Sequence, residues 1–331
     1  MLQRHVQPFS AGASAEKEEQ KNMGKKILVL ASANRDLVLV MDRMPDPGET
    51  FRGESYAYAF GGKGSNAAVA TARQGADVTI ATCLGNDGNG RDIFASYEKE
   101  GMDTRAVVFT DEAQTGFALC TVERDGNSRI VVVPGANEHI RFSDIPEDIL
   151  NEPFDALMTQ FEVPYPEVVA ACTWAQRRGI DVVIDAGPAL PLPLEELCGV
   201  TIFSPNETET ALLTGGMPVA TEQECLEASK VLFGRVHPRF VVLKLGARGA
   251  YLFDGQEGEM IPGFRVDAVD PTAAGDSFTS AMMLRYIETG DIRAAIRYGH
   301  AAGALATLTV GAQNSLPTKE QIESFLKERS A

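Results

Sequence analysis

The 331-residue sequence has few of the residues that build metal centres and disulfide frameworks: it contains 5 cysteines and 4 histidines. The cysteines are widely spaced, odd in number and free of any C-x-x-C pair, which is typical of a reducing compartment. We therefore expect a cytoplasmic location. No two histidines have the i, i+4 spacing of a zinc-binding helix, so a tightly bound transition metal is not expected.

Basic residues and long apolar runs are also scarce. The 30 Lys and Arg residues stand against 46 Asp and Glu residues, which gives a formal net charge of −16. A field of this sign repels polyanions and offers no basic face to nucleic acid or anionic lipid. No apolar run approaches the ~20 residues that cross a bilayer. We expect neither a nucleic-acid partner nor a membrane span, and local groups must hold any anionic ligand.

The first residues of the chain differ from the rest. Residues 1–23 are polar and rich in Glu, Lys and Gln, without the apolar centre of a signal peptide or the Arg/Ser-rich character of a transit peptide. We predict a flexible tail at 1–25 and one domain at 26–331.

Short apolar runs alternate with helical patterns along the domain. A run such as 26–31 suits a strand buried on both faces, and a pattern such as 66–74 suits the helix that follows. Two stretches, at about 36–60 and 114–134, are instead β-rich with period-2 character. The alternation predicts an α/β fold with a doubly wound, mostly parallel sheet, and the two stretches predict a small β-sheet lid inserted in it.

The sharpest local motif is Asp270-Pro-Thr-Ala-Ala-Gly-Asp276-Ser-Phe, which leads into a strongly helical segment. Small residues leave the backbone N–H groups of a helix start accessible, and the positive end of the helix dipole favours a phosphate there. Gly275 permits close approach. Asp276 is either a helix N-cap or a general base, and the local sequence leaves both interpretations open.

A second glycine-rich segment, Phe60-Gly-Gly-Lys-Gly-Ser-Asn66, also precedes a helix. Glycines let a backbone approach a polyol closely, while Lys63 and Asn66 can hydrogen-bond hydroxyl groups. A plain turn with a helix cap is the alternative. The spacing matches neither the P-loop nor the dinucleotide fingerprint.

Polar side chains follow two predicted strands. Asn206 as N-cap and Glu209 as its capping-box partner explain one cluster structurally, yet strand ends in open α/β sheets bind ligands, and carboxylates there can organise hydrated Mg²⁺. Asn34 and Asp36 follow the first strand in the same manner. They either face a sugar or form an Asx-type turn.

Taken in order, five segments resemble the ribokinase family of carbohydrate kinases across residues 26–325. They are Gly-Gly-Lys-Gly-x-Asn at 61–66, Gln160-Phe-Glu162, Pro205-Asn-Glu-Thr-Glu209, Leu245-Gly-Ala-Arg-Gly249 and the motif at 270–278. The resemblance implies a Rossmann-like sheet, with a β lid that often clasps a second copy in a homodimer. It also implies transfer of the γ-phosphate of ATP to a hydroxyl of a small sugar, ribose or a related pentose.

The resemblance further implies roles for individual residues. The catalytic base is matched by Asp276, and the anion hole by Ala273, Ala274 and Gly275. Sugar-contacting positions are matched by Asn34, Asp36, Gly62, Lys63, Asn66, Glu162 and Asp276. Positions on the nucleotide side are matched by Asn206, Lys244, Gly246, Gly249 and His300, the last of which also fits a partly buried helix histidine. Glu209 matches a position near Mg²⁺, and the ligands of an activating K⁺, mostly backbone oxygens, are matched by Asp270, Thr272, Thr309, Gly311 and Ser315.

Two departures from the family pattern leave the substrate open. Asp185-Ala-Gly-Pro-Ala189 stands where Asn-Pro-Ala-Pro is usual, and Ser65 and Ala67 replace Ala and Gln. The alternatives are a kinase for deoxyribose, fructose, a nucleoside or a keto-deoxy sugar acid, and a non-catalytic sugar or nucleotide sensor. The intact Asp276 and its helix start argue against a sensor.

Overall fold

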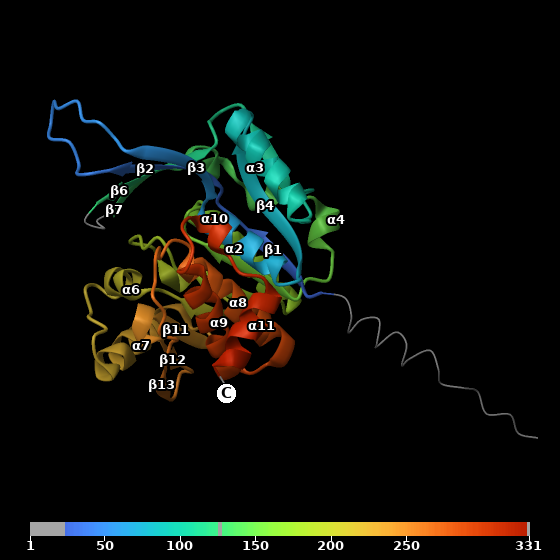
Figure 1. Cartoon of the computed structure of the whole chain (residues 1–331). Coiled ribbons are helices and arrows are strands. Elements are labelled where there is room, and N and C mark those ends of the chain that lie inside the picture. Colours follow the sequence, from blue (N-terminus) through green and yellow to red (C-terminus); the bar gives the residue numbers. More distant parts are fainter. Residues whose placement is uncertain (1–23, 125–127, 330–331) are drawn as a thin grey trace, which may run out of the picture.

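The computed structural model of the chain describes residues 24–124 and 128–329 (Figure 1). Nearly all of the tail predicted at 1–25, and the centre of the lid turn at 125–127, lie outside the described residues. The strands are β1 Lys26–Leu30, β2 Asn34–Met41, β3 Ser55–Gly61, β4 Asp77–Gly85, β5 Val107–Thr110, β6 Gly116–Glu123, β7 Ser128–Val133, β8 Ala156–Gln160, β9 Asp181–Asp185, β10 Val200–Ser204, β11 Phe240–Lys244, β12 Ala250–Phe253 and β13 Gly258–Ile261.

Helices separate most of these strands. The α-helices are α2 Lys63–Arg73, α3 Gly88–Lys99, α4 Glu147–Leu150, α5 Tyr165–Arg178, α6 Glu207–Leu213, α7 Glu222–Val236, α8 Ala274–Thr289, α9 Ile292–Ala306, α10 Ala312–Ser315 and α11 Lys319–Glu328. Short 3₁₀ turns are η1 Gly135–His139, η2 Phe142–Asp144, η3 Leu194–Glu196 and η4 Gly246–Arg248. Within the described part of the chain, no helix has both the length and the apolar character that a bilayer crossing requires.

The main sheet has nine strands in the order β13-β12-β11-β10-β9-β8-β1-β4-β5. Its pairs are parallel from β11 to β5, and only β12 and β13 run antiparallel at one edge. The predicted mostly parallel sheet is therefore confirmed. Parallel strands end at a common edge, so the polar segments after β1, β8, β9 and β10 are brought together there.

Alternate residues of the central strands feed two separate cores. In β1, Leu28 and Leu30 pack on the side covered by α5 and α7, whereas Ile27 and Val29 pack on the side covered by α2, α3, α8 and α9. All four side chains are fully buried. Each contributes roughly 1.5–3 kcal/mol on leaving water, which makes the sheet a rigid support for the residues at its edge.

A separate four-stranded sheet has the order β3-β2-β6-β7 and projects from the main body (Figure 1). Strand β2 pairs in parallel with β6 from Asn34↔Gly116 to Met41↔Glu123, and antiparallel with β3. The small second sheet matches the predicted β lid. Only a short connection, 31–33, separates β1 from β2, and β3 ends directly before α2, so both strands are rooted at the edge of the main sheet.

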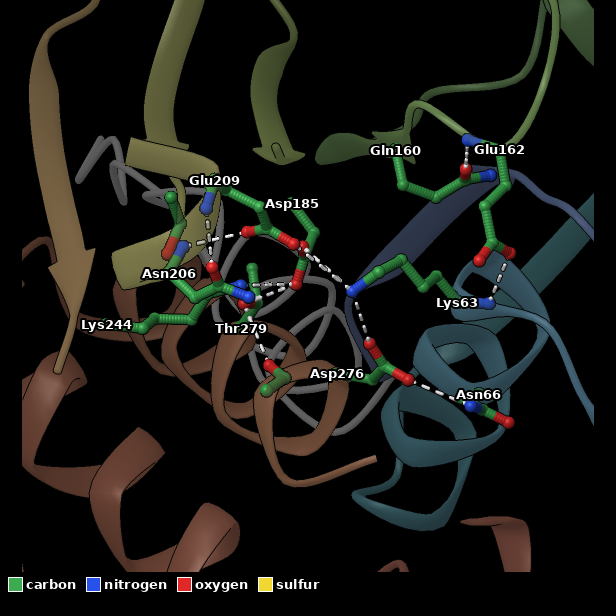
Figure 2. Close-up of polar contacts among 12 residues, drawn as sticks. Lys63, Asn66, Gln160, Glu162, Asp185, Asn206, Glu209, Lys244, Asp276 and Thr279 are labelled. Carbon is green, nitrogen blue, oxygen red and sulfur yellow. Dashed lines mark hydrogen bonds and ion pairs between the residues drawn. The ribbon is translucent and has the colours of Figure 1, made fainter. Parts of the chain in front are cut away.

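Helices α8 and α9 follow each other without an intervening strand and pack closely. A Cβ atom added to Gly299 would lie 2.8 Å from the carbonyl oxygen of Phe278, so glycine is needed for this approach. The contact fixes α8 in place, with its amino-terminal turn among the polar side chains of Figure 2.

Candidate active site

Asp276 lies in the first turn of α8 and is buried. Its Oδ2 accepts a hydrogen bond of 2.8 Å from Asn66 Nδ2, and its Oδ1 lies 3.7 Å from Lys63 Nζ (Figure 2). The N-cap of α8 is Ala273, which has no capping side chain, so the N-cap interpretation of Asp276 is wrong. The carboxylate instead faces α2, which brings together the two glycine-containing motifs, 210 residues apart in sequence.

The amino-terminal turn of α8 offers backbone donors beside this carboxylate. The N–H groups of Gly275 and Asp276 have no backbone acceptor within the described residues, whereas that of Ala274 donates to Pro271 O at 3.2 Å. Of the predicted anion-hole residues Ala273, Ala274 and Gly275, only Ala274 has its N–H bonded to a backbone acceptor within the described residues, and the anion hole stays a prediction. Ala273 has a φ of 59°, a left-handed conformation that costs roughly 1–3 kcal/mol for a non-glycine residue and often accompanies function.

Lys63 begins α2 and lies among three carboxylates. Its Nζ is 3.7 Å from Asp185 Oδ1, from Glu209 Oε1 and from Asp276 Oδ1. Burial disfavours its charge, but Asp185, Asp276 and Glu209 outweigh burial and raise the pKa of Lys63 well above its ordinary value. Gly62 precedes it with a φ of 91°, and a Cβ there would lie 2.9 Å from Ser32 O. Glycine is thus required for the turn that places Lys63.

Asp185 ends β9 and is almost completely buried. Its Oδ2 accepts hydrogen bonds from Lys244 Nζ at 2.7 Å and from Thr279 Oγ1 at 3.1 Å. Burial favours the neutral carboxyl, but Lys244 and Lys63 hold the pKa of Asp185 below its ordinary value. The site therefore contains a charged carboxylate between two ammonium groups.

The predicted sugar-binding residues lie around the amino-terminal end of α2. Glu162 Oε2 accepts from Ser32 Oγ at 2.7 Å and from the N–H of Lys63 at 3.0 Å. Asn34 is the first residue of β2, not part of a turn, so the Asx-type interpretation is wrong. Its Oδ1 accepts from Asn137 Nδ2 at 2.8 Å. Asn34, Gly62, Lys63, Asn66 and Glu162 thus belong to one connected cluster.

Several buried polar atoms in this region lack a partner in the described part of the protein. They are Asp36 Oδ1, Asn66 Oδ1 and Gln160 Nε2. Buried polar groups are normally hydrogen-bonded, so unpaired ones in a site await a ligand or water. Burial, reinforced by Glu162 and Asp276, raises the pKa of Asp36 to about 7. Gln160 also lines a pocket together with Lys63, Asp185, Asp276 and others.

The predicted nucleotide residues lie on the other side of Lys63. Asn206 and Glu209 form a complete capping box at the start of α6, with mutual bonds of 2.7 and 2.8 Å, so the structural interpretation is confirmed. Glu209 nevertheless turns Oε1 toward Lys63. Lys244 ends β11, where Asn206 forms a bridge to it, and Gly246 and Gly249 lie in the hairpin turn that follows.

His300 is a buried histidine of α9. Its Nε2 lies 3.2 Å from Ile261 O, and its ring packs at a tilted angle of 48° against that of Phe278, with the ring centroids 5.0 Å apart. Burial lowers the pKa of His300 to about 4, so the ring is neutral at pH 7. The structure agrees with the alternative of a buried helix histidine, and its nucleotide role stays a prediction.

The five predicted K⁺ positions lie on two neighbouring loops. Asp270 joins the loops, because its Oδ2 accepts from the N–H of Gly311 at 2.8 Å and its Oδ1 from the N–H of Thr272 at 2.9 Å. Ser315 ends α10 and is buried, whereas Thr309 is exposed. No group of three or more His, Cys, Asp or Glu residues suited to a metal ion occurs within residues 24–124 and 128–329.

Sequence reasoning missed three residues that hold the site together. Asn137 fixes Asn34, Thr279 fixes Asp185, and Asp185 itself was noted only as a departure from the family pattern. Asp185 ends the largely apolar run at 180–185, and the carboxyl end of a buried strand is where open α/β sheets bind ligands. Asn137 and Thr279 carry no comparable local signal.

Comparison with known proteins identifies the family. A model described as "pfkB family carbohydrate kinase" matches residues 24–319. A ribokinase of Haemophilus influenzae is 36% identical over 306 residues, covering 92% of this chain and 99% of that protein. A deoxyribokinase of Salmonella typhi is 31% identical over 304 residues, covering 91% and 98%.

Solved structures agree with this result. Arabidopsis thaliana ribokinase, complexed with ribose and ATP, superposes with a TM-score of 0.84 at 29% identity, covering 92% of this chain and 99% of that one. The family match, the relatives and the fold agree over nearly the whole described chain. The chain therefore belongs to the pfkB family of carbohydrate kinases.

Proposed function

We propose that this protein is an ATP-dependent sugar kinase that phosphorylates a hydroxyl of ribose or a related pentose. The observation that carries the proposal is the meeting of Asp276 and the free N–H groups of the α8 turn with Lys63 and Asn66 of α2. A base, an anion hole and polyol-binding groups are the parts that phosphoryl transfer to an alcohol needs.

In this reaction Asp276 accepts the proton of the attacking hydroxyl. Asn66 donates to Oδ2 and the ammonium of Lys63 lies 3.7 Å from Oδ1, so the base is held in a fixed orientation beside the pocket that it lines. The N–H groups of Gly275 and Asp276 stabilise the charge of the transferring phosphoryl group. Asp36 and Asn66 provide unpaired acceptor oxygens for sugar hydroxyls, and Gln160 provides a donor.

Mg²⁺ would be held on the side of Glu209. Mg²⁺ prefers oxygen ligands and is usually bound by one or two carboxylates, phosphates and water, so a single carboxylate oxygen turned into the site fits it. Glu209 Oε1 meets this condition, because only Oε2 is used by the capping box. Bound Mg²⁺ neutralises charge on the phosphate oxygens of ATP.

K⁺ would lie between the loops at 270–272 and 309–315. The bond from Gly311 to Asp270 already joins these loops, and backbone oxygens there suit a hard cation. The loop at 270–272 leads directly into the α8 turn. Bound K⁺ supplies positive charge that supports the anion hole.

The test is a coupled ADP-release screen over pentoses, hexoses, nucleosides and sugar acids, with and without K⁺. Turnover with ribose or another pentose, raised by K⁺, is the expected result. The deoxyribokinase relative makes deoxyribose the second candidate. Turnover with no acceptor, despite sugar binding, would contradict the kinase proposal and indicate a sensor.

Activity should fall on acidification as Asp276 takes up a proton. Burial, opposed by Lys63 and reinforced by Asp185, raises the pKa of Asp276 to about 6. Only the ionised form accepts the hydroxyl proton, so kcat/KM should rise as pH rises through about 6. The measurement is the pH profile of kcat/KM for the sugar, and a profile flat from pH 5 to 8 would contradict the role of Asp276.

We also propose that the lid forms a homodimer. Its outer strands expose Tyr58, Ile130 and Val133, which are 56%, 61% and 56% exposed, and a second copy of the same sheet would cover them. Separately, the proposed reaction makes a sugar and ATP the small-molecule partners. The cytoplasmic location stays a prediction.

Replacing Ile130 by lysine should weaken the dimer at least about tenfold, because a charge would be buried without a partner. Light scattering during size-exclusion chromatography over a range of concentrations measures this. Val231→Lys changes an exposed apolar residue on α7, outside the lid, and should leave the dimer intact. A wild-type protein that is monomeric at all concentrations would refute the proposal.

A further inference from the structure

Lys244 is a buried lysine with a single partner in the described structure. It extends from the carboxyl end of β11, and its Nζ donates to Asp185 Oδ2 at 2.7 Å. An ammonium group has three N–H donors, so two remain unassigned. Thr279 Oγ1 lies 3.1 Å from the same carboxylate oxygen and 3.0 Å from Gly275 O, so its one O–H can donate to either, and it places the pair beside the first turns of α8 (Figure 2).

The ammonium of Lys244 lies beside the anion hole. A Cβ atom added to Gly275 would have Lys244 Nζ as its nearest neighbour, at 3.7 Å. The N–H of Gly275 itself has no backbone acceptor in the described chain. A full positive charge and free amide donors thus border the same space, which is the environment that a phosphoryl group with developing negative charge requires.

The other lysine of the site is less free to neutralise phosphate. Lys63 Nζ is shared at 3.7 Å among three carboxylates, whereas Lys244 has one carboxylate partner. A buried ion pair rarely adds stability beyond that of apolar side chains of similar size, so stability alone does not explain Asp185 and Lys244. The position of the pair beside the start of α8 gives a functional explanation.

We propose that Lys244 is a catalytic residue whose ammonium contacts the phosphoryl group being transferred, and that Asp185 is the positioning residue that holds it there. The inference rests on the proposed kinase reaction and deepens it. Aspartate stands at 185, where the resemblance led us to expect asparagine, and its carboxylate supplies the charge that pairs with Lys244.

The first test is Lys244→Met. Loss of one positioned cation from an anion hole should lower kcat by ~10²–10³. Binding of a non-hydrolysable ATP analogue should weaken at least about tenfold, while AMP and sugar binding change little, because only the terminal phosphates lose a contact. Isothermal titration calorimetry and steady-state kinetics give these values. Lys230→Met, an exposed lysine on α7, serves as the control.

Unpaired Asp185 can destabilise the single variant, so Asp185→Asn/Lys244→Met is measured beside it. A stable double variant with the same loss of kcat supports the proposal, and one that regains wild-type turnover overturns it. A Lys244→Met protein with kcat and analogue affinity within threefold of wild type also overturns it. A wild-type protein that phosphorylates no acceptor contradicts the kinase reaction instead, and analogue binding still tests Lys244.

Discussion

Asp276→Asn is expected to lower kcat by at least ~10², because asparagine cannot accept the proton of the attacking hydroxyl. Sugar affinity should be largely kept, since the other predicted sugar-binding residues, Asn34, Lys63 and Glu162 among them, are unchanged. Asparagine has nearly the same shape and can still interact with Asn66, so the loss should appear in kcat and not in folding. Steady-state kinetics and calorimetric sugar binding separate the two.

Asp291→Asn is the matched control. Asp291 caps α9 through bonds to the N–H groups of Arg293 and Ala294, and asparagine is an equally good N-cap. This variant should have wild-type turnover and thermal stability. Near-normal kcat in Asp276→Asn would refute the general-base role, and a loss confined to sugar affinity would make Asp276 a binding residue only.

Lys63→Met is expected to have the second large effect. Removing the ammonium leaves three carboxylates facing one another, and Lys63 is the group that most opposes the raised pKa of Asp276. The pKa of Asp276 should therefore rise further, so that less of the base is ionised at pH 7. We expect kcat/KM at pH 7 to fall by at least ~10² and the acid limb of the pH profile to move at least about one unit upward.

Lys63→Arg keeps the charge and should leave the acid limb closer to its wild-type position, although the geometry of the guanidinium differs. The same kcat/KM profiles, measured from pH 5 to 9, compare the three proteins. A Lys63→Met variant that loses activity with an unmoved limb would mean that Lys63 acts by contact with substrate and not through the pKa of Asp276.

The burial of the strands explains how much of the fold could be predicted from the sequence. Runs such as Lys26–Leu30 are apolar at every position, because both faces of a parallel sheet are covered, and that pattern is visible in sequence. The edge strands Val107–Thr110 and Gly258–Ile261 are short and only partly buried, and their sequences lack this pattern. Their pairing depends on the strands beside them.

The site was predictable in its residues but not in its contacts. The motifs around Lys63 and Asp276 carry their chemistry locally, since glycines and small residues before a helix are recognisable in sequence. The bond between Asn66 and Asp276 depends on how α2 and α8 pack across 210 residues. The role of Asp185 likewise appears only when β9 and β11 place it beside Lys244.

Strand β2 connects the cluster of predicted sugar-binding residues with the projecting four-stranded sheet. It starts at Asn34, one of the predicted sugar-binding residues, and runs to Met41 in the projecting sheet, paired along its full length with β6. We therefore expect a shift at one end of β2 to affect the other end. If the proposed dimer forms through that sheet, we expect substitutions on its outer surface to alter substrate preference without touching the substrate.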